Sequence, residues 1–165
     1  MKTYITRILV LGFVALFAFS IRPATAEEFP LSAKAWQATV VQIEGQNSSR
    51  ALAVGEVQRN NAEEYCERDP GGITKQYGGK LTKEQCVQNV LAKEQGKRYP
   101  ASADCPRKTI KTSWDETFVA IGKDSFGQHI WQNVNTGKIL DGSNASGAPV
   151  VAGQFKMLCP VYINP

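Results

Sequence analysis

The sequence contains few of the residues from which enzyme active sites are usually built. It has a single histidine, His129, and none of its four cysteines belongs to a CxxC pair. It has no GxSxG nucleophile elbow and no Gly-rich loop that carries a phosphate-binding lysine. These absences remove the usual signatures of a zinc site, a thioredoxin-like redox centre, an α/β-hydrolase and a nucleotide-binding loop. We therefore expect a non-enzymatic protein that uses no metal and no cofactor.

The chain also lacks a surplus of charge once its amino-terminal segment is set aside. Three of the 19 lysine and arginine residues lie in residues 1–26, whereas all 15 acidic residues follow that segment. The remaining 16 basic and 15 acidic residues give a net charge close to zero. Proteins that bind nucleic acid need a basic surplus on one face, because phosphate neutralisation supplies their affinity. The composition therefore predicts no nucleic-acid partner.

Residues 1–26 have the features of a secretory signal peptide in the usual order. Lys2 and Arg7 precede an uncharged apolar run over residues 8–21, and small residues follow at positions 24–26. The run is shorter than the roughly 20 apolar residues that cross a bilayer, although an uncleaved anchor is the alternative. No second run of that length follows, so no membrane span is expected after cleavage. We predict one periplasmic or secreted domain over residues 27–165.

The even number of cysteines predicts two disulfides, because an exported chain folds in an oxidising compartment. Four cysteines allow three pairings, of which Cys66–Cys86 with Cys105–Cys159 is favoured. The first pair would join two helical segments. The second would join the entrance of a strand-rich region to its last strand.

The amino-terminal half, about residues 32–96, has the spacing of helices. Helices are predicted over residues 33–43 and 50–67, although the β-branched run at 39–41 makes a strand the competing interpretation of the first. The segment 82–95 has the clearest signal, since Thr82 and Gln85 fit a capping box and Gly96 can close the helix.

The carboxyl-terminal half, about residues 108–163, has the alternation of strands. Strands are predicted at 108–114, 117–123, 128–134 and 138–140, and Phe155, Met157 and Cys159 alternate with other residues in a further strand. The fold predicted from both halves is α+β. Its helical half would pack on a small antiparallel sheet or an SH3-like barrel, and two disulfides would stabilise it.

A nine-residue polar loop at 141–149 offers the best candidate for recognition. It is rich in small residues and follows a hairpin that carries an aromatic residue, a combination suited to sugar rings or a protein surface. A plain surface turn beside a core tryptophan is the competing interpretation. The candidate ligand-binding residues are Trp131, Asn133, Asp141, Ser143, Asn144 and Ser146.

The stretch at 145–148, with Gly153 after it, resembles the serine-glycine loop of the periplasmic lysozyme inhibitors, without the aromatic pattern that surrounds it in that family. The leading hypothesis is a binding protein of the bacterial envelope or exterior, whose partner is a protein or a glycan. The resemblance implies the alternative of an inhibitor of a wall-degrading enzyme. A small secreted hydrolase that uses His129 and Asp141 is a third possibility.

Overall fold

The structure is a computed structural model that describes residues 27–32, 36–68, 81–140, 142 and 147–163. The predicted signal peptide, residues 1–26, lies outside these ranges. Within them the protein is a mixed α/β domain with three α-helices and one eight-stranded antiparallel sheet.

The sheet is a meander in which each strand pairs with the strands that precede and follow it in the chain. Bulges interrupt the register between Val40 and Gln42 and between Ala120 and Gly122. In chain order the strands are β1 (Glu28–Pro30), β2 (Gln37–Glu44), β3 (Ala51–Glu56), β4 (Tyr99–Asp104), β5 (Thr109–Lys111), β6 (Thr117–Lys123), β7 (His129–Asn133) and β8 (Ile139–Leu140).

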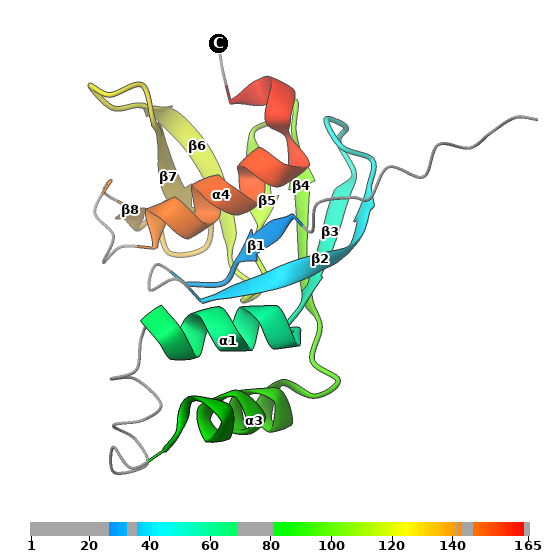
Figure 1. Ribbon diagram of the computed structural model, residues 1–165. Coiled ribbons are helices and arrows are strands. Elements are labelled where there is room, and N and C mark those ends of the chain that lie inside the picture. Colours follow the sequence, from blue (N-terminus) through cyan, green and yellow to red (C-terminus); the bar gives the residue numbers. More distant parts are fainter. Residues whose placement is uncertain (1–26, 33–35, 69–80, 141, 143–146, 164–165) are drawn as a thin grey trace, which may run out of the picture.

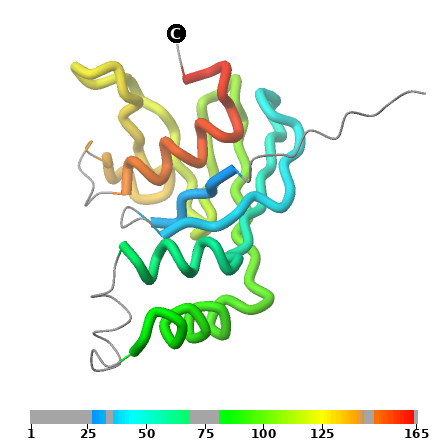
Figure 2. The backbone as a smooth tube through the Cα atoms, viewed as in Figure 1, coloured from blue at the N-terminus to red at the C-terminus, as the bar shows by residue number. Residues whose placement is uncertain are grey.

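The helices lie in two places relative to this sheet (Figure 1). Helices α1 (Arg59–Arg68) and α3 (Lys83–Glu94) both belong to the connection from β3 to β4, and α1 lies between β2 and α3. Helix α4 (Ala148–Leu158) crosses one face of the sheet and contacts β1, β3, β4 and β7, as the backbone path in Figure 2 also shows. A 3-10 turn, η2 (Pro160–Tyr162), follows it.

The main core lies between α4 and the sheet. Trp131 and Phe155 meet there edge to face, with ring centroids 5.1 Å apart. A smaller second core joins α1 to α3. The largest fully buried apolar side chains of the main core are Trp131, Phe29, Phe118, Phe155, Ile110 and Leu158.

The prediction of a helical amino-terminal half was wrong for residues 33–43 and for the first part of the segment 50–67, whereas the rest of that second segment forms α1. Residues 37–44 form β2, because the β-branched run at 39–41 favours extended backbone. Residues 51–56 form β3, in which the fully buried Ala51 and Ala53 alternate with Leu52. A Cβ added at Gly55 would lie 3.0 Å from Phe29 and Ala38, so the glycine lets β1 and β2 approach closely.

The prediction of a last strand near residue 155 was also wrong, since this segment belongs to α4. Gly147 adopts a left-handed conformation before the helix, and Pro149 occupies its first turn, where a missing N–H costs nothing. Val151, Phe155 and Leu158 are all fully buried and recur at helical spacing. The alternation of Phe155, Met157 and Cys159 is therefore a by-product of a helix that is buried on most of its circumference. The sheet is also not confined to residues 108–163, so the predicted SH3-like barrel does not describe it.

Several expectations are confirmed. Helix α3 has the predicted capping box, in which Gln85 N–H donates to Thr82 Oγ1 and Thr82 N–H donates to Gln85 Oε1. Gly96 has a φ of 73° just beyond its end. The strand predicted at 117–123 is β6, and those predicted around 128–134 and 138–140 are β7 and β8.

Both disulfides have the favoured pairing. Cys66–Cys86 joins α1 to α3. Cys105–Cys159 joins the end of the β4 segment to the carboxyl-terminal end of α4, where the sequence had predicted a strand. Two such bonds are consistent with a small stabilised protein of an oxidising compartment.

Candidate binding site

Trp131 and Asn133 lie on β7 and face the core. Trp131 is 0% exposed, and its Nε1 has no hydrogen-bond partner among the described residues, so packing alone holds the indole. The side-chain oxygen of Asn133 accepts hydrogen bonds from the backbone N–H groups of Asn135 and Thr136. Both residues therefore stabilise the fold in this structure, and neither offers a free surface to a ligand.

The other four predicted ligand-binding residues, Asp141, Ser143, Asn144 and Ser146, lie outside the described residues. Their role in binding stays a prediction. The described residues that flank them belong to β8, at Leu140, and to the first turn of α4, at Gly147 and Ala148. These flanking elements border a pocket.

The pocket has a volume of about 300 Å³ and lies between the β6–β7 hairpin, β8 and the first turns of α4. Ligand pockets usually begin at about this size and are mostly apolar, with a few polar groups that orient the ligand. This one matches that description. Among the described residues that line it, the polar members are Asp124, Gln128 and His129, and the others are Ile130, Ile139, Leu140, Gly142, Ala148, Pro149 and Ala152.

A tight turn holds Asp124 at the rim of this pocket. Its Oδ1 accepts hydrogen bonds from the backbone N–H groups of Phe126, at 2.8 Å, and Gln128, at 2.9 Å. Backbone bonds from Asp124 N–H to Gln128 O and from Gly127 N–H to Asp124 O complete the turn, and Gly127 has the positive φ that it requires. The turn presents Phe126 to solvent, 85% exposed.

His129 lies on β7 and is half-buried. Its ring packs edge to face on Trp131 and Phe155, with centroids 5.6 and 6.2 Å away. Its Nε2 lies 3.4 Å from the backbone oxygen of Tyr162. The ring therefore links η2 to the core beside the pocket, and among the described residues no carboxylate forms a hydrogen bond with it.

Other hollows are less suited to a small ligand. Two shallow ones, of about 270 and 420 Å³, adjoin on the sheet surface near Leu52, Ser102 and Lys111. An open groove of about 700 Å³ runs beside the end of α3, where charged residues such as Glu56 and Arg98 pair across it. All three are more open to solvent than the pocket beside His129.

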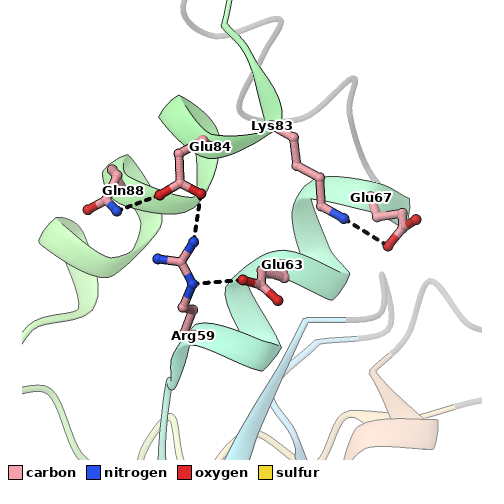
Figure 3. Close-up of polar contacts among 6 residues, drawn as sticks. All are labelled: Arg59, Glu63, Glu67, Lys83, Glu84 and Gln88. Carbon is pink, nitrogen blue, oxygen red and sulfur yellow. Dashed lines mark hydrogen bonds and ion pairs between the residues drawn. The ribbon is translucent and has the colours of Figure 1, made fainter.

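The charged residues of α1 and α3 form a network of surface ion pairs (Figure 3). Arg59 bridges Glu63, at 2.7 Å, and Glu84, at 2.6 Å. The hydrogen bond from Gln88, followed by that from Arg59, lowers the pKa of Glu84. A lowered pKa is the opposite of what a general acid needs at neutral pH. In the part of the chain that the structure describes, no group of three or more His, Cys, Asp or Glu side chains could hold a metal ion.

No protein-family model, no curated protein and no solved structure matches this chain. Among the described residues, none of the helices has the length and apolar character needed to cross a membrane.

Proposed function

We propose that the protein is an exported, non-enzymatic binding protein of the bacterial envelope or exterior, periplasmic or secreted, which takes a small ligand group into the pocket beside Asp124 and His129. The observation that carries the proposal is this mostly apolar pocket of about 300 Å³ with polar groups at one rim. The signal-like segment and the two disulfides support export. The ligand group would belong to an envelope protein or glycan, and the mature chain would need neither a membrane span nor a cofactor.

The environment of the polar rim favours binding over catalysis. A general base needs a second group to orient it, and the recorded contacts of His129 are a backbone oxygen and two aromatic rings. Asp124 uses one carboxylate oxygen to hold its own turn. These contacts fix the shape of the pocket and leave its polar atoms to select a ligand.

A titration followed by NMR tests this proposal. Mature protein labelled with ¹⁵N would be titrated with N-acetylglucosamine oligosaccharides and, separately, with short apolar peptides. One of the two probe classes should shift the amide signals of residues 124–130 and 148–152. The result that overturns the proposal is the absence of such shifts with both classes.

A substitution that fills the pocket tests whether the ligand binds there. Ala152→Leu adds three carbon atoms to a pocket wall on α4, so it should abolish the shifts while the rest of the spectrum stays native. Ala92→Leu makes the same change on the exposed face of α3 and should leave binding unchanged. Shifts that persist in Ala152→Leu would place the binding site elsewhere.

The exposed Phe126 supports a second candidate function, inhibition of a wall-degrading enzyme. A rigid turn that carries an aromatic side chain can insert into the cleft of a partner at little cost in conformational entropy. The assay is lysozyme activity with and without the protein, and Phe126→Ser should weaken any inhibition. No inhibition at micromolar excess removes this candidate.

A further inference from the structure

The carboxylate of Asp124 is only half used by its turn. Oδ1 accepts both backbone hydrogen bonds, whereas no hydrogen bond or ion pair is recorded for Oδ2 among the described residues. The two oxygens of one side chain thus have different roles. Oδ1 holds the hairpin, and Oδ2 remains able to accept a hydrogen bond from a ligand.

Oδ2 lies on the pocket side of the turn. A Cβ added at Gly142 would lie 3.7 Å from Oδ2, and no other described residue beyond its chain neighbours comes within 4 Å of it. Asp124 and Gly142 both line the pocket, so the described residues leave room for a methyl-sized group beside this oxygen. A donor atom of a bound ligand can occupy that space.

From this geometry we propose that the pocket selects a primary ammonium group attached to a small apolar body. The inference rests on the proposed function and names the chemical class of its ligand. A ligand that fills the apolar pocket removes water from Oδ2, and a buried carboxylate is costly unless a positive charge pairs with it. A neutral ligand would leave that charge unpaired, and an anionic ligand would be repelled.

The rest of the pocket supplies the apolar half of the recognition. Ile130, Leu140 and Pro149 lie among its lining residues, so a ring or a short alkyl chain can pack there while the ammonium group reaches Oδ2. The same chemistry occurs in free amines and in lysine side chains. The two sources can be compared with benzylamine and with Nα-acetyl-lysine amide.

The test compares three ligands that share one ring. Benzylamine, benzyl alcohol and benzoate would be titrated against the ¹⁵N-labelled mature protein, followed at the amides of residues 124–130. Benzylamine should bind about tenfold or more tightly than benzyl alcohol, which is the size of a charge-assisted hydrogen bond, and benzoate should not bind. Nα-acetyl-lysine amide, whose side-chain ammonium group is free, should bind if the natural ligand is a lysine side chain. A preference for benzylamine over it would identify a free amine as the natural ligand.

Asp124→Asn is the decisive variant, because asparagine keeps the side-chain oxygen that accepts from Phe126 and Gln128 but removes the charge. In this variant benzylamine and benzyl alcohol should bind with affinities within about twofold of each other. Asp115→Asn, in a turn where the carboxylate pairs with Lys111, is the matched control and should keep the wild-type preference.

Three results separate the inference from the proposed function. Equal binding of benzyl alcohol and benzylamine by the wild type would overturn the ammonium inference and leave the pocket as a binding site. A preference that survives in Asp124→Asn would also overturn it. No shift with any ligand of the series, combined with no shift in the glycan and peptide titrations, would overturn both.

Discussion

Gln154 is the residue whose substitution tests the architecture most directly. It lies on α4, it is 0% exposed, and its amide joins three separate segments. Its Nε2 donates to the backbone oxygen of Pro30, at 2.7 Å, and to Ser113 Oγ, at 2.8 Å. Its Oε1 accepts from the backbone N–H of Ser113, at 3.1 Å. The side chain therefore ties α4 to β1 and to the β5–β6 turn.

Gln154→Leu keeps the approximate volume of the side chain and removes all three hydrogen bonds. A buried polar group that loses its partner costs about 1–3 kcal/mol. Pro30 and Ser113 are half-buried, so water can form hydrogen bonds with some of the groups on these two residues that lose their partner in the variant. We therefore expect a loss of about 2–4 kcal/mol, a large share of the roughly 5–15 kcal/mol of a typical domain.

Urea unfolding followed by tryptophan fluorescence measures this loss. Gln88→Leu is the control, because Gln88 is exposed on α3 and the same change there should cost no more than about 0.5 kcal/mol. Ser113→Ala, alone and combined with Gln154→Leu, should give a coupling of about 0.5–3 kcal/mol. If Gln154→Leu unfolds at the same urea concentration as the wild type, this network does not stabilise the fold.

Three further predictions concern stability. Replacing Cys66 and Cys86 by serine should cost about 3 kcal/mol, because the bond closes a loop of sequence separation 20, and hydrogen exchange should accelerate first in residues 83–94. Gly153→Ala should lower the melting temperature, since the added Cβ would lie 2.8 Å from the ring of Pro30; an unchanged or higher value would show that β1 yields. Burial and the hydrogen bond to Glu94 raise the pKa of Tyr99 above its usual 10.0, so its contribution to stability is complete below about pH 10 and is lost as the pH rises further. Tyr99→Phe should therefore flatten the alkaline fall in unfolding free energy relative to the wild type.

Local signals in the sequence predicted the elements in which only one type of secondary structure fits the residue pattern. The capping residues of α3, the β-branched and aromatic residues of β6 and the alternation of β7 were sufficient to predict these elements. Residues 51–65 carried two periods at once. Small residues at alternate positions build β3, and the same small residues also fit a helical stripe, so only pairing with β2 and β4 decides between them.

Helix α4 was missed for a different reason. It is buried on most of its surface, and a segment without a polar face shows neither the helical nor the strand period clearly. The signals that could have identified it were a glycine followed by proline in the first turn and the spacing of Val151, Phe155 and Leu158. The sequence could not predict that its one buried polar residue, Gln154, is buried, because the hydrogen-bond partners of Gln154 lie on β1 and on the β5–β6 turn.

The loop that the sequence predicts to bind a ligand is flanked by residues that line the proposed pocket, whereas Trp131, also predicted to bind, is buried. Trp131 was chosen because an aromatic residue beside a polar loop suits a ligand, yet the alternation of β7 turns it into the core. Asp124 lies in a turn, and the sequence Asp-Ser-Phe-Gly at 124–127 has the signature of one. What the sequence does not contain is the position of Gly142, which lies opposite the second oxygen of Asp124 at the wall of the pocket.

The pocket and the α1–α3 pair belong to different parts of the molecule. Helix α3 packs chiefly on α1 and is linked to it by Cys66–Cys86, and α1 reaches the sheet at β2. The pocket is bounded instead by the β6–β7 turn, β7, β8 and the amino-terminal end of α4, whose other end is linked to the sheet by Cys105–Cys159. No described residue of α3 lines the pocket, whereas releasing Cys159 frees one end of the helix that forms a wall. We therefore expect loss of Cys105–Cys159 to weaken binding in the proposed pocket, and loss of Cys66–Cys86 to lower stability with little effect on that pocket.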